Sequence, residues 1–473
     1  MKIITHKILA LTMMANLAFS AAGLAAAETT VPPPAQFRNG DTVCFIGDSI
    51  TRDGRYMSDI QLFYATRFPD RHMTFVNCGI GGDIAAGAIN RLDWDILAHN
   101  PNRATIMLGM NDVMKGLYRQ ANPSEHTLKR RADALNDYTA NMNTLITALK
   151  QEKIELNLIR PSIYDDTAEL PKPADQGINK ALAFCAEQVV KLATQHDCRV
   201  VDFYDIMTAV NARRQKKDPA WTIVGKDRIH PGATGHFVMA YAFLRAQNVP
   251  RHVSRLVIDY SDGKLVECEN GRVQAMKLDP NGHVQFEWLA AALPFPGRAE
   301  FREALTLVPF VEEMNVEWFQ VQALPEGDYT LAIDDEPVGV YSAKELAAGV
   351  NLAVNEKTPQ YRQAVKVAEL NNQRHNIESG TLRIIAMIEQ RARKHGVEEV
   401  DNLAAVRASI EGFLQAHRDA WAIDIYKRQW QRYLEVKPKE EELKAEWRKT
   451  YEAMRKAGRP RKHKYELNRQ PEK

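Results

Sequence analysis

Residues 42–51 have the sequence TVCFIGDSIT, in which a short apolar run passes through a glycine-containing turn to a serine, Ser49. An apolar run without alternating polar residues is typical of a strand that is buried on both faces of a parallel sheet. In such sheets the functional residues gather in loops at the carboxyl ends of the strands. The stretch therefore predicts a parallel sheet and places Ser49 at its functional edge.

Further short apolar runs follow, and segments with helical periodicity separate them. Apolar residues recur every three or four positions over residues 135–149 and 178–192, which is typical of amphipathic helices. The alternation predicts an α/β domain over residues 28–250, with a parallel sheet and helices on both faces. The further runs are residues 74–76, 104–108, 154–159 and 200–203.

The residue pattern of the sequence changes beyond this domain. Residues 251–350 carry Asp-Gly and Asn-Gly pairs between β-rich runs, and these pairs favour hairpin turns, so we expect a small antiparallel, β-rich module. Residues 351–473 predict helices that pack on the body of the protein, with a disordered basic tail from about Gly458. Ser342 with Glu345 has the spacing of a helix capping box.

The first residues are organised like a secretory signal peptide. Lys2 and Lys7 precede an apolar run over residues 8–22, and the small residues 25–27 offer a cleavage site. We therefore interpret residues 1–27 as a signal peptide and predict an exported protein, periplasmic or secreted, without stable membrane insertion after cleavage. A single membrane anchor is the alternative, which the short run disfavours.

Charge and cysteine content restrict the partners. The chain has 62 basic and 60 acidic residues and a formal net charge of +2, which argues against a protein built to hold nucleic acid. The basic run 458–462 resembles a minor-groove DNA-binding motif, but we interpret it as a solvated tail. Five scattered cysteines do not form a disulfide framework, and a bridge between Cys185 and Cys198 stays open. No metal site is predicted.

Several polar residues could make Ser49 a nucleophile. An alcohol needs a base, and Asp227 and His230 stand close enough for one turn to bring the carboxylate against one ring nitrogen while the other faces Ser49. The negative oxygen of the tetrahedral intermediate needs donors, which a backbone N–H in Gly81-Gly82-Asp83 and the side-chain amide of Asn111 can supply. We therefore predict that Ser49, Asp227 and His230 are catalytic and that Asn111 donates to the oxyanion.

These residues stand in sequence blocks that resemble the motifs of the SGNH hydrolase superfamily, also called GDSL esterases. The resemblance covers about residues 40–248 and implies an SGNH/flavodoxin-like fold, a serine nucleophile at Ser49 and no cofactor. It also implies an oxyanion hole formed by Ser49, Gly82 and Asn111. Gly81 stands where many members carry a side chain, which implies a roomier oxyanion loop. Ser49 also lacks the Gly-x-Ser-x-Gly elbow of the α/β-hydrolase fold. The matching blocks are residues 47–50, 77–83, 109–112 and 227–230.

The resemblance implies a serine esterase that forms an acyl-enzyme, and we expect a carbohydrate O-acetylesterase acting on acetylated glycan. The alternatives are a lysophospholipase or thioesterase, and a non-catalytic glycan-binding protein with a degenerate hydrolase domain. The oligomeric state stays open. We interpret His236 as a packing or hydrogen-bonding residue, and Asp48, Asn77 and Asp83 as loop braces. Candidate sugar contacts are Arg52, Arg55, Tyr56, Arg91, Trp94, Tyr164 and Trp221.

Overall fold

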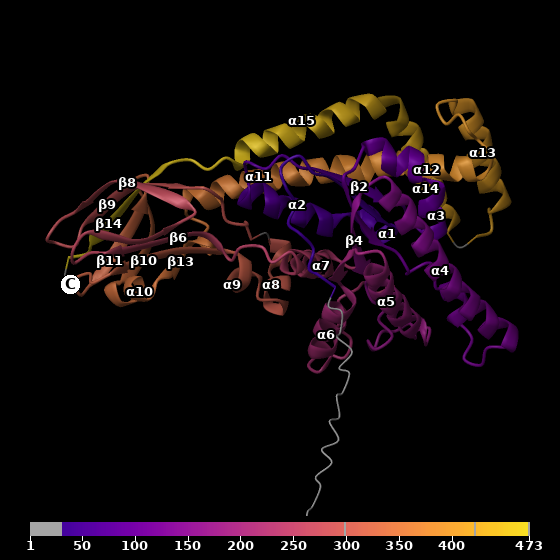
Figure 1. The fold of residues 1–473 in the computed structure, drawn as a ribbon, viewed down its shortest axis with the longest axis horizontal. Helices are drawn as coiled ribbons and strands as arrows, with labels where there is room; N and C mark the ends of the chain where they lie inside the picture. Colours follow the sequence, from indigo (N-terminus) through magenta and orange to yellow (C-terminus); the bar gives the residue numbers. More distant parts are fainter. Residues whose placement is uncertain (1–30, 298, 421, 472–473) are drawn as a thin grey trace, which may run out of the picture. The chain divides into compact units, whose positions relative to one another are not determined.

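A computed structural model describes residues 31–297, 299–420 and 422–471 (Figure 1). The predicted signal peptide, residues 1–27, lies outside this range. In the described part of the chain, no helix is both long and apolar enough to span a membrane.

A five-stranded parallel sheet forms the centre of the α/β part, in the order β2-β1-β3-β4-β5. Val43 of β1 lies opposite Phe75 of β2 and Arg103 of β3, so β1 is a central strand. The predicted parallel sheet is thereby confirmed. Its strands are β1 Thr42–Gly47, β2 Thr74–Gly79, β3 Arg103–Met107, β4 Glu155–Arg160 and β5 Arg199–Asp202.

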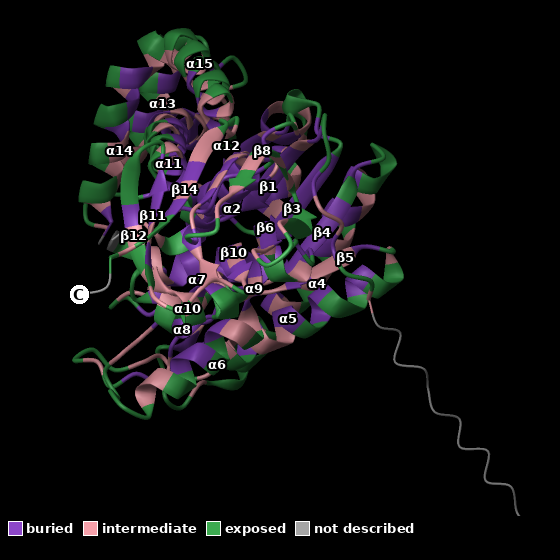
Figure 2. Ribbon diagram, turned by 90° about the vertical axis from the view of Figure 1, so that its left-hand side faces the viewer, coloured by how far each residue is buried: buried purple, intermediate pink, exposed green. Residues whose placement is uncertain are grey.

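Helices cover both faces of this sheet, which explains the uninterrupted apolar run at β1. Val43 and Phe45 belong to an apolar cluster with α2 and α7, whereas Cys44 and Ile46 belong to one with α4 and α5. Figure 2 shows β1 and α2 as largely buried. The helices of this part are α1 Ser49–Asp53, α2 Arg55–Arg67, α3 Ala85–Asn90, α4 Glu125–Gln151, α5 Ile178–Gln195, α6 Tyr204–Gln215 and α7 Ala233–Ala246.

The β-rich part contains two packed sheets, ordered β13-β10-β6-β7 and β12-β11-β14-β9-β8. One apolar cluster joins them, with Phe319 of one sheet packed near Phe286 of the other. The expectation of a purely antiparallel module was wrong, because β6 and β10 pair in parallel through a long connection. The strands are β6 His252–Asp259, β7 Lys264–Glu269, β8 Gly271–Leu278, β9 Val284–Ala290, β10 Val316–Gln322, β11 Asp328–Ile333, β12 Glu336–Ser342 and β13 Val350–Asn351.

The basic C-terminal segment is a strand, so the predicted disordered tail was wrong. β14, His463–Arg469, lies between β9 and β11 and pairs with both in antiparallel fashion. Tyr465 and Leu467 alternate with charged residues and are buried in the core between the sheets. The period-2 pattern of this segment therefore outweighs its basic composition. The β-rich sheets draw on residues from both sides of the predicted boundary at residue 350.

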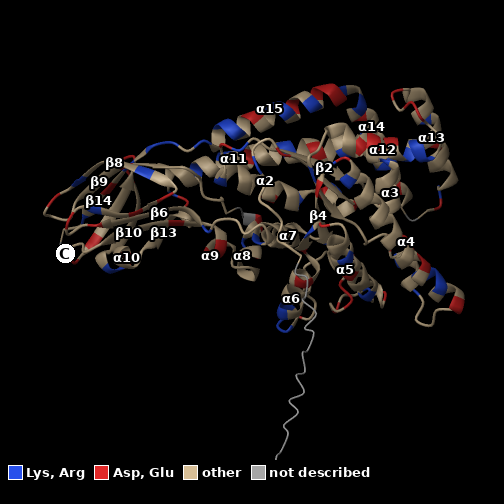
Figure 3. Ribbon diagram, viewed as in Figure 1, with Lys and Arg blue, Asp and Glu red and all other residues tan. Residues whose placement is uncertain are grey.

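The C-terminal helices pack on the α/β part, as expected. Asn371 of α11 donates to Ser58 of α2, and the guanidinium of Arg374 lies over the ring of Trp447 in α15. Acidic residues lie in the first turn of α15 and basic ones in its last turn, which complements the helix dipole (Figure 3). These helices are α11 Pro359–Ile377, α12 Arg383–Lys394, α13 Leu403–Ala416, α14 Ile423–Val436 and α15 Glu440–Gly458.

Short elements complete the chain. Ser342 and Glu345 form the predicted capping box at α10. A π-helical turn, η6, separates α11 from α12. The remaining elements are η1 Leu92–Ile96, η2 Leu97–His99, η3 Lys115–Tyr118, η4 Ala299–Phe301, α8 Ala304–Leu307, α9 Phe310–Met314, α10 Ala343–Ala348, η5 Leu352–Val354, η6 Glu378–Leu382 and η7 Lys437–Lys439.

Candidate active site

The structure brings Ser49, His230 and Asp227 together. Ser49 is the first residue of α1, directly after β1, and its Oγ lies 2.8 Å from Nε2 of His230. Nδ1 of His230 lies 2.5 Å from Oδ2 of Asp227. The side chains of His230 and Asp227 are 49% and 51% exposed, so this chain of contacts borders on solvent. A hydroxyl, an imidazole and a carboxylate in this order can act as nucleophile, base and orienting group.

A local turn holds Asp227 against His230. Oδ1 of Asp227 accepts hydrogen bonds from the backbone N–H groups of Ile229 at 3.1 Å and His230 at 3.0 Å. Partial burial raises the pKa of Asp227, but hydrogen bonds from the His230 ring and from these N–H groups lower it further, to about 2. Asp227 is therefore ionised at neutral pH and can hold the tautomer of His230 that keeps its proton on Nδ1.

Arg228 anchors the turn from within, and sequence reasoning missed it. Its backbone is left-handed, with φ of 67°, and its buried guanidinium donates to the carbonyl oxygens of Asp165, Ala168 and Lys172. The backbone N–H of Asp165 donates in return to the carbonyl oxygen of Arg228. The signal available in the sequence was the position of Arg228 between Asp227 and His230.

Gly82 and Asn111 lie on adjoining loops. Gly82 is exposed, with φ of 78°, so a side chain at this position would strain the backbone. Nδ2 of Asn111 donates to the carbonyl oxygen of Asp83 at 3.0 Å and makes a long contact of 3.4 Å with Oδ2 of Asp48. Asn111 thereby lies beside the immediate neighbours of both Gly82 and Ser49.

Lys115 fixes the orientation of the Asn111 amide, and sequence reasoning missed it as well. Its Nζ donates to Oδ1 of Asn111 and to the carbonyl oxygen of Met110, both at 2.8 Å. Because an ammonium group only donates, Oδ1 must face Lys115 and the amide hydrogens must face the opposite side. The clue in the sequence was a lysine shortly after the Gly109–Asp112 block, in the same loop.

Two carboxylates brace the loops around the site. Asp48 accepts from the backbone N–H of Ile50 at 2.9 Å and thereby caps α1, as its expected role as a brace requires. Asp112 accepts from the backbone N–H groups of Ala85 at 2.8 Å and Gly109 at 3.0 Å. Burial raises the pKa of each carboxyl group to about 6.

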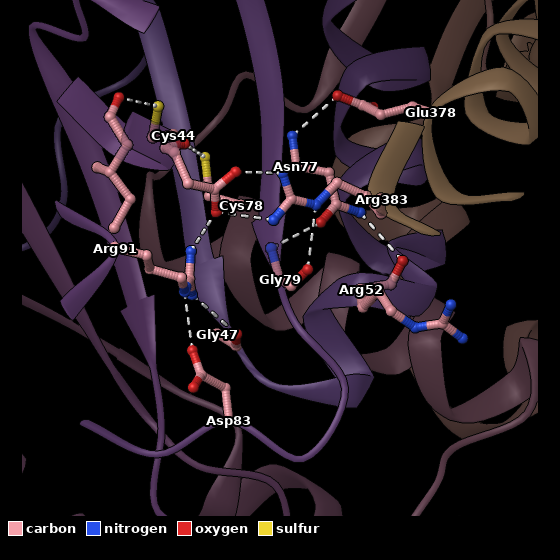
Figure 4. Close-up of polar contacts among 12 residues, drawn as sticks. Cys44, Gly47, Arg52, Asn77, Cys78, Gly79, Asp83, Arg91, Glu378 and Arg383 are labelled. Carbon is pink, nitrogen blue, oxygen red and sulfur yellow. Dashed lines mark hydrogen bonds and ion pairs between the residues drawn. The ribbon is translucent and has the colours of Figure 1, made fainter. Parts of the chain in front are cut away.

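A buried cluster of charges lies behind the loop of residues 79–83. Arg91 pairs with Asp83 at 2.8 Å and with Asp95 at 2.6 Å, and its side chain is inaccessible to solvent. Arg383 of α12 donates to both oxygens of Asp95, at 2.7 and 2.8 Å, and to the carbonyl oxygen of Gly79 at 3.1 Å. Figure 4 shows Arg383 reaching to Gly79 and Arg91 lying between Gly47 and Asp83.

The helical region also contacts the second sequence block directly. Oε1 of Glu378 accepts from the backbone N–H of Asn77 at 2.9 Å (Figure 4). Asn77 in turn donates to the carbonyl oxygen of Arg52 and accepts from the N–H of Gly79, as the expected brace does. No local pattern in the sequence predicts that distant helices contribute polar groups to this loop.

Several candidate sugar contacts are unavailable to a ligand. Tyr56, Tyr164 and Arg91 are buried, and the charge of Arg91 is compensated by its ion pairs. These three expectations were wrong because the residues face the interior. The indole of Trp221 donates to Glu303, and the ring of Trp94 lies under the guanidinium of Arg393.

Other expectations concern packing and metals. His236 is buried, and its Nδ1 accepts from the backbone N–H of Tyr56 at 3.4 Å, in agreement with a packing and hydrogen-bonding role. Cys185 and Cys198 are both buried free thiols. Among the described residues, no group of three or more His, Cys, Asp or Glu side chains is placed to hold a metal ion.

Comparison with known proteins identifies relatives of this arrangement. Residues 45–237 match the model of the GDSL-like Lipase/Acylhydrolase family. The chain is similar to an acetylxylan esterase from Geobacillus stearothermophilus, with 27% identity over 224 residues that cover 44% of this chain and 94% of the esterase.

The solved structure of a gut microbial diltiazem-metabolizing enzyme resembles almost the whole chain. The TM-score is 0.85 at 29% sequence identity, and the match covers 93% of this chain and 100% of the other. The combination of α/β part, β-rich sheets and C-terminal helices therefore recurs in that enzyme.

Proposed function

We propose that Ser49 is the nucleophile of a serine esterase, because residues 45–237 match the model of the GDSL-like Lipase/Acylhydrolase family. The observation that carries the proposal is the 2.8 Å contact from Ser49 to His230, continued at 2.5 Å to Asp227. Ser49 Oγ attacks the ester carbonyl while Nε2 of His230 takes its proton. His230 then returns the proton to the leaving alcohol, and water hydrolyses the acyl-enzyme.

We assign the oxyanion hole to the backbone N–H groups of Ser49 and Gly82 and the amide of Asn111. An amide carries two hydrogens, and the carbonyl oxygen of Asp83 receives one of them at 3.0 Å. The contact from the same amide to Asp48 is long, 3.4 Å, so a developing oxyanion can compete for the second hydrogen. Lys115 prevents the amide from turning over.

The preferred substrate in this proposal is a short-chain ester, an acetyl group on carbohydrate. The similarity to an acetylxylan esterase supports this choice. The half-exposed side chains of His230 and Asp227 also suit a bulky, hydrated substrate better than a long acyl chain that needs an apolar tunnel. Export through the signal peptide proposed for residues 1–27 would bring the enzyme to polysaccharide outside the cytoplasm.

A second candidate substrate class is an ester drug. It is favoured by the 93% coverage of this chain by the structure of a diltiazem-metabolizing enzyme. Both candidates use the same site and differ in the alcohol that leaves.

The test measures acyl preference and alcohol preference separately. Purified protein is assayed on 4-nitrophenyl acetate, butyrate and octanoate, on acetylated xylo-oligosaccharides with acetate release as readout, and on diltiazem by mass spectrometry. We expect acetate to be preferred over octanoate by about tenfold or more, which corresponds to about 1.4 kcal/mol. A preference for octanoate would instead favour a lysophospholipase or thioesterase. Failure of a fluorophosphonate to label Ser49 would favour the degenerate, glycan-binding alternative.

A further inference from the structure

A polar cavity of about 230 Å³ adjoins the segments that carry Ser49 and His230. Arg55 lines it at the start of α2, just beyond the short helix that Ser49 begins, and Ala233 lines it at the start of α7, just beyond His230. Its opposite wall belongs to segments outside the predicted α/β domain, namely η4 and α11. Of the candidate sugar contacts expected from the sequence, Arg55 lines this cavity.

Asp53 lies between the cavity wall and the helix that follows His230. Its Oδ1 lies 3.1 Å from Nε of Arg55 and 3.3 Å from Nε2 of His236, which belongs to the first turn of α7. The end of the Ser49 helix and the start of the helix after His230 therefore lie next to each other beside the cavity. A substrate whose acyl group is at Ser49 can extend its alcohol part into this space.

Helix α11 presents a fixed face to the cavity. Asn372, His375 and Asn376 line it from positions that share one side of the helix. The neighbouring stripe of α11 is docked firmly, because Asn371 donates to Oγ of Ser58 at 2.8 Å and Arg374 donates to Oε1 of Gln61 at 2.7 Å. The amide groups are thereby held at a constant distance from α2.

The lining chemistry matches hydroxyl groups. The exposed amides of Asn372 and Asn376 each donate and accept, and Arg55 adds donors, so the wall can satisfy groups that also do both. Apolar surface comes from Ala233 and Phe301. A site for an acyl chain would be lined by apolar side chains instead, as drug-sized apolar pockets are.

We propose that this cavity is a subsite for a glycosyl unit in the alcohol part of the ester. The inference rests on the proposed esterase function and adds that η4 and α11 select the alcohol. It assigns the C-terminal helices a direct role in substrate binding. The subsite binds a sugar, and an ester whose alcohol is too small does not reach it.

The test compares one large and one small alcohol in a variant of the cavity wall. Asn372→Ala with Asn376→Ala removes both exposed amides, and Gln373→Ala removes an exposed amide of the same helix that does not line the cavity. On acetylated xylo-oligosaccharide we expect the double variant to lose about tenfold in kcat/KM, mainly through KM, while methyl acetate hydrolysis stays within about twofold. Gln373→Ala should resemble the wild type on both substrates.

Separate outcomes distinguish the subsite from the proposed function. Suppose that the wild type releases acetate from the oligosaccharide. If kcat/KM of the double variant then falls equally on both substrates, or falls on neither, the proposed subsite is wrong while the proposed esterase function stands. If the wild type hydrolyses methyl acetate and releases no acetate from the oligosaccharide, the carbohydrate function fails and the subsite fails with it. Unacetylated xylo-oligosaccharide should also inhibit methyl acetate hydrolysis competitively in the wild type and about tenfold more weakly in the double variant.

Discussion

Two charged clusters of this protein have similarly short contacts and opposite environments. In the Ser49 site, His230 and Asp227 are about half exposed, whereas Arg91, Asp95 and Arg383 have side chains that are at most 6% exposed. The half-exposed cluster is held by a turn within a few residues. The buried cluster joins segments that lie far apart in the chain.

The difference in exposure suits two roles, catalysis for the half-exposed cluster and structural support for the buried one. The half-exposed cluster contains the groups proposed for chemistry, which substrate and water must be able to reach. In the buried cluster, burial opposes ionisation of Asp95, but Arg383 and Arg91 more than offset it and lower its pKa. That carboxylate stays charged, and removing one partner leaves an uncompensated buried charge.

Removal of the proposed nucleophile should have the largest effect and leave the fold intact. Ser49→Ala is expected to lower kcat/KM on 4-nitrophenyl acetate by about five powers of ten, or roughly 7 kcal/mol, because attack and proton transfer both depend on its hydroxyl. The midpoint of urea unfolding should not move, since Ser49 borders on solvent. Retained ester hydrolysis in a correctly folded variant would contradict a catalytic role for the half-exposed cluster.

Breaking the buried cluster should act on stability. Arg383→Met is expected to lower the free energy of unfolding by about 3–5 kcal/mol, measured by urea denaturation, because Asp95 loses its bidentate partner. Combining it with Asp95→Asn should recover part of this loss.

The matched control is Arg407→Met, which removes an exposed ion pair with Glu411 on α13. Its effect should stay within about 0.5 kcal/mol, as for other exposed pairs on one helix. Equal effects of Arg383→Met and Arg407→Met would mean that burial does not distinguish the two kinds of cluster.

Loss of the proposed oxyanion donor should act on rate alone. Asn111→Ala is expected to reduce kcat by about two to three powers of ten, or about 3–4 kcal/mol, with KM nearly unchanged, because the amide serves the transition state. Asn281→Ala, in an exposed turn between β8 and β9, is the control and should leave kcat unchanged. A rise in KM with constant kcat would place Asn111 in substrate binding instead.

The smallest effect concerns acid stability at the site. The pKa of Asp227 is about 2 in the folded protein, below the ordinary value near 3.9, so its ionised form favours folding. This contribution is present above about pH 4 and is lost as the pH falls toward about 2. Because Asp227 is half exposed, we expect it to be worth less than about 1 kcal/mol.

The measurement compares urea unfolding of the wild type and Asp227→Asn at about pH 6, 4 and 2.5. The wild type should be slightly more stable at the highest pH, and the gap should close as the pH falls. A gap that widens on acidification would contradict the depressed pKa of Asp227.

Local features of the fold were predictable because they depend on neighbouring residues. The apolar run at β1, the capping box at Ser342 and the spacing of Asp227 and His230 all fall within one element or turn. The order of the blocks along a parallel sheet also predicts that their loops share one edge. The parallel pair β6 and β10 was missed because turn signals describe hairpins and not long connections.

Predictions from composition were wrong where contacts with distant segments determine the structure. The basic run before β14 suggested disorder, yet Tyr465 and Leu467 add a strand to a sheet formed much earlier in the chain. Arg91 was a reasonable sugar contact by residue type, but Asp83 and Asp95 draw it into the interior. In both cases the partners are invisible to a reading of the local sequence.

The sequence alone was enough to predict the α/β fold and to select the residues of the candidate site. Strand patterns depend on neighbouring residues, and the carboxyl edge of a parallel sheet is where the loops with the motifs gather. Only the tertiary structure decided what surrounds that site. Glu378 and Arg383 contact Asn77 and Gly79 from hundreds of positions away in the sequence, and α11 forms one wall of the polar cavity. Burial of a charge depends on every chain segment that packs around it, so it cannot be predicted from the local sequence.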